Sequence, residues 1–421
     1  MATTRDFNEM LNEHLDYDLM ASEYISRDWL ISNVERDDEW KGGTIPVPFK
    51  GAQASSISFG SLTDAANIGK SRFVRGTIES YKEMWGALKF NHTDLIQHDG
   101  KVNEDSFLKI LPDEMEDFTQ FMKERGSCVM LNGFASLASG DGDSSGNIAV
   151  RHPERFVLDE LVYVDDSDSV VSAAGYIRTI DKNTGTLTLY DAPITGGSVV
   201  DLSAYSLASD AKVYYNGTQP GTDLGFTSVR SQLLSAANGG SATLFGKTKT
   251  AWPYLQALQL DGSNFSQVNI LEGLFNKWSV AKQRCANRPE AAVMSFKNAS
   301  AVLKCLEINK GAYNIVPGSQ KVTAYGWEEV MIGGPKGTLK VVSVLEMEDD
   351  IIWFKSKKGF KFHSNGFFRT RTNPDGRKYH EVRATTGYSY IVDMMLFGEL
   401  ACYMPEANAI VHSIDFELSE S

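Results

Sequence analysis

The first forty residues combine apolar residues at helical spacing with a dense run of acidic side chains. The apolar residues that fall on one helical face are Phe7, Met10, Leu11, Leu15, Leu19 and Met20. Residues 1–40 also hold eleven acidic side chains and three arginines, a net charge of 3 minus 11, or −8. Because such an amphipathic segment needs a surface for its apolar face, the pattern predicts an N-terminal arm that contacts a partner.

An extended pattern replaces the helical one between residues 41 and 90. Pro46 and Pro48 exclude a helix there, and the following stretch up to Gly69 is rich in Ser, Gly and Ala. Strand-like sequence resumes at Arg72 and continues to Lys89. The pattern predicts a long hairpin with a polar tip, and an excursion of this length in a folded protein is usually functional.

A long helix is predicted over residues 112–131. Pro112 suits a first helical turn, and Asp113, Glu114 and Glu116 suit the positive end of the helix dipole. Apolar residues at helical spacing then keep one face buried.

Residues 156–218 predict a small inserted all-β barrel or sandwich. Short strands at 157–158, 176–178 and 186–189 are separated by turn residues, of which 181–185 (Asp-Lys-Asn-Thr-Gly) is the clearest turn.

Helix and strand patterns alternate from about residue 225 to 350. Asn269 is a candidate N-cap for a helix that reaches Cys285, residues 291–296 predict a buried strand, and Asn298 is a candidate N-cap for a second helix. Further strands are expected after this second helix.

The C-terminal part predicts strands. Residues 339–345 and 351–354 are strand-like, and Asn373-Pro374-Asp375-Gly376 predicts a turn that joins 367–370 and 379–383 into a hairpin. The region 355–383 carries nine basic and two acidic side chains, a net charge of +7.

Composition excludes several classes of protein. A chain of 421 residues exceeds one compact core and predicts two or three lobes with extensions. The net charge of −13 argues against a protein that grips nucleic acid through its phosphates, although an acidic chain can still enclose DNA.

Cysteine usage and hydropathy point to a reducing compartment and no membrane. Neither a C-x-x-C pair nor a histidine at metal spacing accompanies the four cysteines, which are Cys128, Cys285, Cys305 and Cys402. The acidic N-terminus lacks the basic start and apolar run of a signal peptide, and no apolar stretch approaches the ~20 residues of a membrane span.

Two segments resemble phosphate-binding loops but break the motif. In Gly246-Lys247-Thr248 the glycine expected five residues earlier is Ser241, and in Gly69-Lys70-Ser71 it is Asp64. Both departures fall where the backbone must approach phosphate, so we interpret both segments as chance matches.

Two other segments resemble ligand-binding motifs. Residues 141–146 resemble the start of a calcium loop, but His152 stands where a bidentate glutamate belongs, so a polar surface loop is the favoured reading and a weak calcium site stays open. Residues 358–362 partly match an RNA-recognition signature, which leaves a base-stacking platform as the alternative to an ordinary edge strand.

No catalytic constellation is recognisable. Neither G-x-S-x-G nor H-E-x-x-H occurs, and the seven histidines are scattered without a carboxylate or nucleophile at telling spacing. The sequence therefore predicts a protein that is not an enzyme, without catalytic, cofactor-binding or metal-binding residues.

The order of elements resembles the major capsid proteins of tailed bacteriophages, whose fold is shared with encapsulins and herpesvirus capsid floors. The stretch that carries the resemblance most specifically is Leu244-Phe245-Gly246-Lys247-Thr248-Lys249-Thr250-Ala251-Trp252-Pro253-Tyr254-Leu255, followed by the helix from Asn269 and the segment Met294-Ser295-Phe296-Lys297-Asn298. The fold class that the resemblance implies is α+β.

The resemblance assigns a role to each part of the chain. The implied parts are an N-terminal arm at 1–40, an extended loop at 41–90, a peripheral domain at 91–155 with a spine helix at 112–131, a β-rich insertion domain at 156–218, an axial domain at 219–345, and the second part of the peripheral domain at 346–421.

The resemblance also implies a function. Such proteins build hexamers and pentamers into an icosahedral shell around double-stranded DNA, with a separate scaffolding protein, a portal and in some cases a decoration protein. The implied location is the virion, with assembly in the host cytoplasm. An encapsulin-like compartment, a phage tail or decoration protein, and a nucleotide-dependent enzyme built on Gly246-Lys247-Thr248 are the alternatives.

Charged residues of the arm, the loop and the basic strand region are the candidates for contacts between subunits. These candidates are Asp37, Asp38, Lys50, Lys70, Arg72, Arg75, Arg369 and Arg371. We expect the acidic arm and the region 355–383 to attract one another across a subunit contact.

Overall fold

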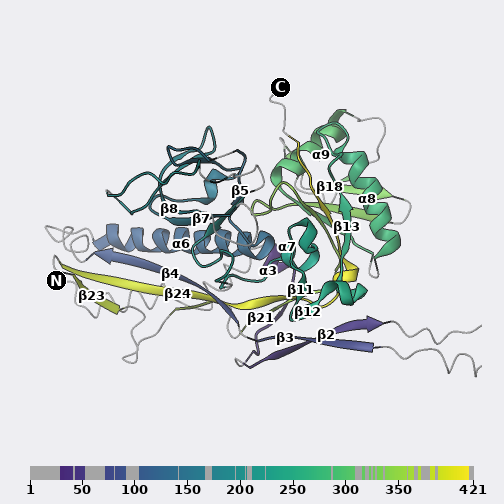
Figure 1. The fold of residues 1–421 in the computed structure, drawn as a ribbon, viewed down its shortest axis with the longest axis horizontal. Helices are drawn as coiled ribbons and strands as arrows, with labels where there is room; N and C mark the ends of the chain where they lie inside the picture. Colours follow the sequence, from purple (N-terminus) through teal and green to yellow (C-terminus); the bar gives the residue numbers. More distant parts are fainter. Residues whose placement is uncertain are drawn as a thin grey trace, which may run out of the picture.

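A computed structural model describes most of the chain. The described residues are 29–40, 43–52, 72–79, 81–91, 104–140, 142–165, 173–194, 196–203, 205, 211–222, 224–285, 288–308, 315–317, 322–323, 326–327, 330–334, 337–357, 359–364, 368–370, 380–384 and 387–416. Helices and several separate sheets share this part of the chain, which confirms the α+β class (Figure 1).

A long helix packs on two long paired strands of a six-stranded sheet. Helix α6 (Glu104–Asn132) lies along β4 (Lys82–Asn91), which runs antiparallel to β24 (Gly387–Cys402) (Figure 1). Helix and strand approach closely, because a Cβ at Gly86 would lie 2.6 Å from Cζ of Phe118.

Two sequence predictions need correction here. The helix begins at Glu104 instead of Pro112, so the proline lies inside the helix. Strand β4 pairs with β24, and the predicted hairpin at 41–90 is therefore shorter, with only β2 (Ile45–Ala52) and β3 (Arg72–Ile78) paired.

A β-rich unit covers the opposite side of α6 (Figure 1). Its strand order is β5 (Ser136–Leu137), β10 (Lys212–Tyr215), β7 (Leu161–Asp165), β8 (Ala173–Asp181), β9 (Thr186–Tyr190) and β6 (Asn147–Ala149). The unit includes the described residues of the predicted β-rich insertion at 156–218, but its sheet starts at residue 136. Val157 and Leu158 were predicted as a strand, yet they lie in a loop with 41% and 61% of their surface exposed.

A mixed sheet with two helices forms the third unit. Its strand order is β13 (Leu258–Asp261), β25 (Ala409–His412), β20 (Ile352–Lys355), β14 (Ala291–Met294), β19 (Gly337–Ser343), β18 (Val330–Gly334) and β15 (Ile315–Pro317). Because β20 and β25 come from the C-terminal part, the unit extends beyond the expected range 219–345.

Helices α8 (Ile270–Arg284) and α9 (Phe296–Ile308) pack in this unit. Asn269 lies at the N-cap position of α8 as predicted, whereas Asn298 lies inside α9 and is not its N-cap. The Asn269 side chain makes no cap hydrogen bond. At α9 the hydroxyl of Ser295 accepts from the Asn298 amide at 3.3 Å, while the Asn298 side chain donates to the Asp349 carbonyl at 2.8 Å.

Strand β24 also organises the smaller strands around it. β22 (Phe368–Thr370) and β23 (His380–Ala384) each pair with a different part of β24, so the predicted hairpin between 367–370 and 379–383 is wrong. The turn itself lies outside the described residues. Strand β21 (Phe360–His363) also pairs with β24, and β1 (Glu35–Asp37) covers its other side.

Candidate assembly surfaces

The β2–β3 hairpin has one packed face and one exposed face. Val47, Phe49 and Val74 are buried, whereas Pro48 and Arg75 are exposed on the opposite face. Within the described chain no third strand pairs with either strand, and the hairpin lies at one extremity of the subunit (Figure 1). Since an isolated two-stranded hairpin is at best marginally stable in water, this one depends on surfaces outside itself.

The outer edge of β2 is poorly suited to accept another strand. Pro46 lies opposite Thr77 in the pairing, and the Thr77 amide donates away from β2, to the Phe245 carbonyl at 3.2 Å. Pro46 and Pro48, which share this side of β2, have no amide hydrogen to offer. Contacts with another molecule would therefore use the exposed side chains of the hairpin face.

The base of the hairpin is clamped by a tight turn. Strands β11 (Thr243–Leu244) and β12 (Lys247–Thr248) are joined by Phe245 and Gly246, both with positive φ. The Phe245 ring stacks on Phe49 with 6.3 Å between centroids. At Gly76 a Cβ would lie 2.7 Å from the Phe49 ring and 2.9 Å from the Phe245 carbonyl oxygen, so only glycine fits without displacement.

The end of the arm pairs with the basic strand region inside one chain. β1 runs parallel to β21, with Asp37 opposite His363. The Asp37 carboxylate lies 3.0 Å from Nδ1 of His363 and 3.7 Å from Nζ of Lys361. Asp38 accepts a hydrogen bond from the Ser364 hydroxyl at 2.7 Å. In the described chain the end of the arm therefore contacts the basic region of its own subunit, and the predicted attraction across a subunit contact stays a prediction.

Burial and charge act against one another in this cluster. Burial alone would raise the pKa of Asp37, but the Glu39 amide, Lys361 and His363 outweigh it and the pKa is lowered. Burial lowers the pKa of His363 in spite of the adjacent carboxylate. Burial, together with the charges of Asp37 and Glu35, raises the pKa of Tyr403 to about 12, so its hydroxyl remains protonated beside Nε2 of His363 at 2.6 Å.

The remaining candidate residues are only partly placed. Arg75 is exposed on the hairpin face. Lys50 lies in β2, Arg72 in β3 and Arg369 in β22, where the structure describes the backbone alone. Lys70 and Arg371 lie outside the described residues. Of these six residues only Arg75 has a described side chain, and it makes no ion pair with Asp37 or Asp38.

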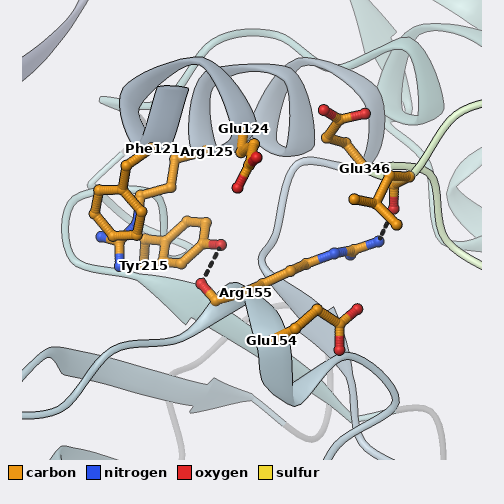
Figure 2. A pocket seen from close by; sticks show the side chains of 8 residues that line it. Phe121, Glu124, Arg125, Glu154, Arg155, Tyr215 and Glu346 are labelled. Atoms are coloured by element: carbon orange, nitrogen blue, oxygen red, sulfur yellow. Dashed lines mark hydrogen bonds between the residues drawn. The ribbon is translucent and has the colours of Figure 1, made fainter. Parts of the chain in front are cut away.

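A junction that the sequence did not reveal joins the β-rich unit to α6 and the mixed sheet. Arg155 forms a buried ion pair with Glu348 and donates to the Ala135 carbonyl at 2.8 Å. Figure 2 shows Arg155 and Tyr215 facing α6 across a hollow of about 40 Å³, with the Tyr215 hydroxyl bonded to the Arg155 carbonyl at 3.1 Å. This volume is far below the 300–1,000 Å³ of a small-molecule site, so the hollow is a structural seam.

The motif lookalikes have structural explanations. Gly246 lies in the β11–β12 turn and Lys247-Thr248 is β12 itself, whereas Gly69-Lys70-Ser71 lies outside the described residues. Asp143 accepts from the Ser145 and Asn147 amides at 2.8 and 2.9 Å, so its carboxylate holds the loop, while Asp141 is not described.

The RNA-recognition lookalike is a core strand. Phe360 and Phe362 are 7% and 0% exposed, so neither ring is accessible for base stacking. Strand β21 lies between β1 and β24. The strand interpretation is therefore right, although the strand is not at the sheet edge.

In the part of the chain that the structure describes, the four thiols are buried and no cluster of three or more His, Cys, Asp or Glu could hold a metal ion. Burial raises the pKa of Cys128 to about 11 and that of Cys285 to about 12. None of the described helices is both long and apolar enough to cross a membrane.

Comparison with known proteins gives likeness at the level of structure. No family model matches the chain, and no curated protein does. The chain is similar in fold to phage capsid proteins. The capsid asymmetric unit of cyanophage A-1(L) matches with 11% identity and a TM-score of 0.49 over 90% of this chain and 91% of that one.

Two further solved structures show the same kind of likeness. The capsid of a native GTA particle matches with 10% identity and a TM-score of 0.44 over 94% of this chain and 91% of that one. The holo-SrpI encapsulin complex from Synechococcus elongatus PCC 7942 matches with 9% identity and a TM-score of 0.37 over 94% and 92%. At these identities no residue role transfers to this chain.

Proposed function

We propose that the chain is a shell subunit, the major capsid protein of a tailed bacteriophage. The observation that carries the proposal is the β2–β3 hairpin, which lies at one extremity of the subunit with an exposed face and two proline-blocked positions on its edge. A hairpin of this kind gains stability by lying against another copy of the same chain.

The β4–β24 strand pair offers a second surface. This strand pair is covered by α6 on one face, where Val392, Met394 and Leu396 are buried. On the other face Trp85 keeps 52% of its surface exposed. A large aromatic residue exposed on an open sheet face is typical of an interaction surface. Two separated surfaces on one chain permit head-to-tail contacts that close into rings.

The finer features of the proposal follow the resemblance. Hexamers and pentamers would form an icosahedral virion shell around double-stranded DNA, with separate scaffolding and portal proteins in the host cytoplasm and, where one exists, a decoration protein. The unit with α8 and α9 would line the ring centres. The net charge of −13 suits a container that does not bind its contents tightly, and the proposed role involves no enzymatic step.

Electron microscopy of the purified full-length protein tests the proposal. We expect closed shells, or tubes and sheets of the same lattice. The variant Arg75→Glu should fold normally yet form few particles, because it changes only the exposed hairpin face. Lys182→Glu, an equal charge change in an exposed turn of the β-rich unit, is the matched control and should assemble normally. Monomers alone under every condition would overturn the shell role, and normal shells from Arg75→Glu would remove the hairpin face from the interface.

A further inference from the structure

A basic hollow opens at one end of the mixed sheet. Lysines from three elements line it: Lys282 from α8, Lys340 from β19, and Lys355 and Lys357 from the end of β20 and the residues after it. Glu290 is the acidic residue in the lining, so the charged lining residues sum to 4 minus 1, or +3. The hollow measures about 610 Å³. Such a positive concentration is unusual in a chain whose net charge is −13.

The arrangement of these lysines favours an anionic occupant. Several ammonium groups around one hollow repel one another, and the repulsion falls when a negative group enters. Lys355 is partly desolvated, and this burial lowers the pKa of its ammonium. The hydrogen bond of its Nζ goes to a neutral group, the carbonyl of Asn33, at 3.0 Å. A carboxylate in the hollow would stabilise the charged form of Lys355.

The acidic N-terminal stretch joins the described chain beside this hollow. Residues 1–28 hold seven acidic side chains and two arginines, a net charge of 2 minus 7, or −5. They join the described chain at Trp29, whose ring meets Trp353 of β20 edge-on at 6.5 Å between centroids. Asn33, which contacts Lys355, lies four residues further on, about 6 Å along a helix.

We propose that residues 1–28 dock acidic side chains into the basic hollow of their own chain. A tether this short gives the segment an effective concentration in the millimolar range, which a separate polyanion or a second copy must exceed to compete. Asp28 and Glu23 are the nearest acids along the chain to Trp29. This inference concerns the single subunit and does not require that the subunit builds shells.

Site-specific photo-crosslinking of the full-length protein tests the proposal. A benzophenone amino acid replaces Thr338, an exposed residue that lines the basic hollow, so every lysine is retained. The matched control places the same probe at Asn276, an exposed residue of α8. Asn276 lines a second hollow of about 450 Å³ whose charged residues, Glu272 and Lys277, cancel. Mass spectrometry should find peptides from residues 1–28 at the Thr338 probe and not at the Asn276 probe.

Charge reversal tests whether the crosslink depends on electrostatic attraction and not only on the short distance along the chain. Asp18→Lys together with Glu23→Lys should lower the Thr338 crosslink yield by about tenfold, since each change replaces an attraction by a repulsion. Lys355→Glu with Lys357→Glu should restore part of it. A crosslink yield that stays the same in these variants would overturn the proposal.

Isotope labelling identifies the occupant. In an equal mixture of heavy and light protein, crosslinks should join heavy to heavy and light to light. Mixed pairs would show a second copy in the hollow, and crosslinks to nucleic acid would show a polynucleotide; either result overturns the own-chain assignment. Dissociated subunits should give the same result as particles, so failure of shell assembly would leave this test intact.

Discussion

The β-rich unit and the β2–β3 hairpin are both sheets of short strands, but only the first contains its own core. In the β-rich unit Ile148, Val162, Ile177 and Leu187 are fully buried within the unit's sheet and its surroundings. The packed face of the hairpin instead rests on Leu244, Leu255 and Ala401, which come from distant segments. The β-rich unit is thus stabilised largely by its own residues, whereas the hairpin is stabilised by what it is placed against.

Local sequence explains the difference. Strand β9 alternates buried and half-buried residues, and the turn before it is held by Asp181, whose carboxylate accepts from the Asn183 amide at 2.9 Å. Strand β2 has Pro46 and Pro48 on its outer side, which limits it to two-stranded pairing.

The largest expected effect is in the core of the β-rich unit. Leu187→Ala should lower the free energy of unfolding by about 2–5 kcal/mol, because it leaves a cavity in a fully buried position. Urea denaturation followed by circular dichroism measures the loss. Lys182→Ala in the adjacent exposed turn should change the free energy by less than about 0.5 kcal/mol. A loss below about 1 kcal/mol for Leu187→Ala would mean that this unit is as loosely packed as the hairpin.

The second effect lies on β24, the strand whose Ala401 supports the packed face of the hairpin. Glu399 is buried, and burial raises its pKa from 4.5 to about 7 although the Thr227 amide donates to it at 2.8 Å. A raised carboxyl pKa means that the folded state holds its proton more tightly than the unfolded state. The resulting stability is full below pH 4.5 and is lost as the pH rises through 7.

Glu399→Gln removes this titration and keeps an oxygen that can accept from Thr227. The variant should match the wild type near pH 5 and be more stable near pH 8 by about 3 kcal/mol, from 1.36 kcal/mol per pKa unit. Thermal and urea unfolding at both pH values give the difference. Because other groups titrate equally in both proteins, a pH-independent difference would show that Glu399 is ionised in the fold.

The third effect separates the hairpin from the rest of the subunit. Gly76→Ala forces a Cβ against Phe49 and the Phe245 carbonyl, which should weaken the clamp by about 1–3 kcal/mol. Amide hydrogen exchange should accelerate in β2 and β3, while the β-rich unit keeps its protection and the melting temperature stays nearly constant. Equal acceleration in both regions would mean that the hairpin unfolds only with the whole subunit.

The sequence predicted elements well where one segment carried the whole signal. Helix α8, the strand at 186–189 and the turn at 181–185 follow from local periodicity and turn residues, and the strand predicted at 291–296 is present but ends at Met294. Prediction from the sequence failed where the pairing partner of a strand lies far away along the chain. Residues 82–91 lie largely within the stretch that the sequence predicted as strand. Their pairing with β24 depends on residues about three hundred positions later. Pro112 suggested a helix start because proline suits a first helical turn and acidic residues follow it, and neither feature excludes two further turns before the proline.

The candidate surfaces show the same limit. The attraction between arm and basic region could be predicted from net charge, but charge alone did not say that Asp37 meets His363 within one chain. The ion pair between Arg155 and Glu348 joins residues 193 positions apart and leaves no local pattern. Three-dimensional proximity alone identifies it.

The smallest expected effect concerns the arm. Like the hairpin, its strand β1 is held by residues from a distant part of the chain. Lys361 is 28% exposed and lies 3.4 Å from Glu35 and 3.7 Å from Asp37, so its ion pairs are partly screened by solvent. Lys361→Glu should destabilise the subunit by no more than about 1 kcal/mol at low salt. The difference should shrink towards zero near 1 M salt, where the Debye length is about 3 Å.

Glu35→Lys in the Lys361→Glu background should restore most of that loss, because the exchanged pair keeps its attraction. Asp37 is left unchanged because it also bonds the buried His363. Urea unfolding across a salt series, with Lys182→Glu as the charge-matched control, measures all three proteins. Since a shell repeats each contact in every subunit, particle stability should follow the same salt series more steeply than subunit unfolding. A Lys361→Glu loss that is unchanged at high salt would show that packing, and not charge, holds β1 against β21.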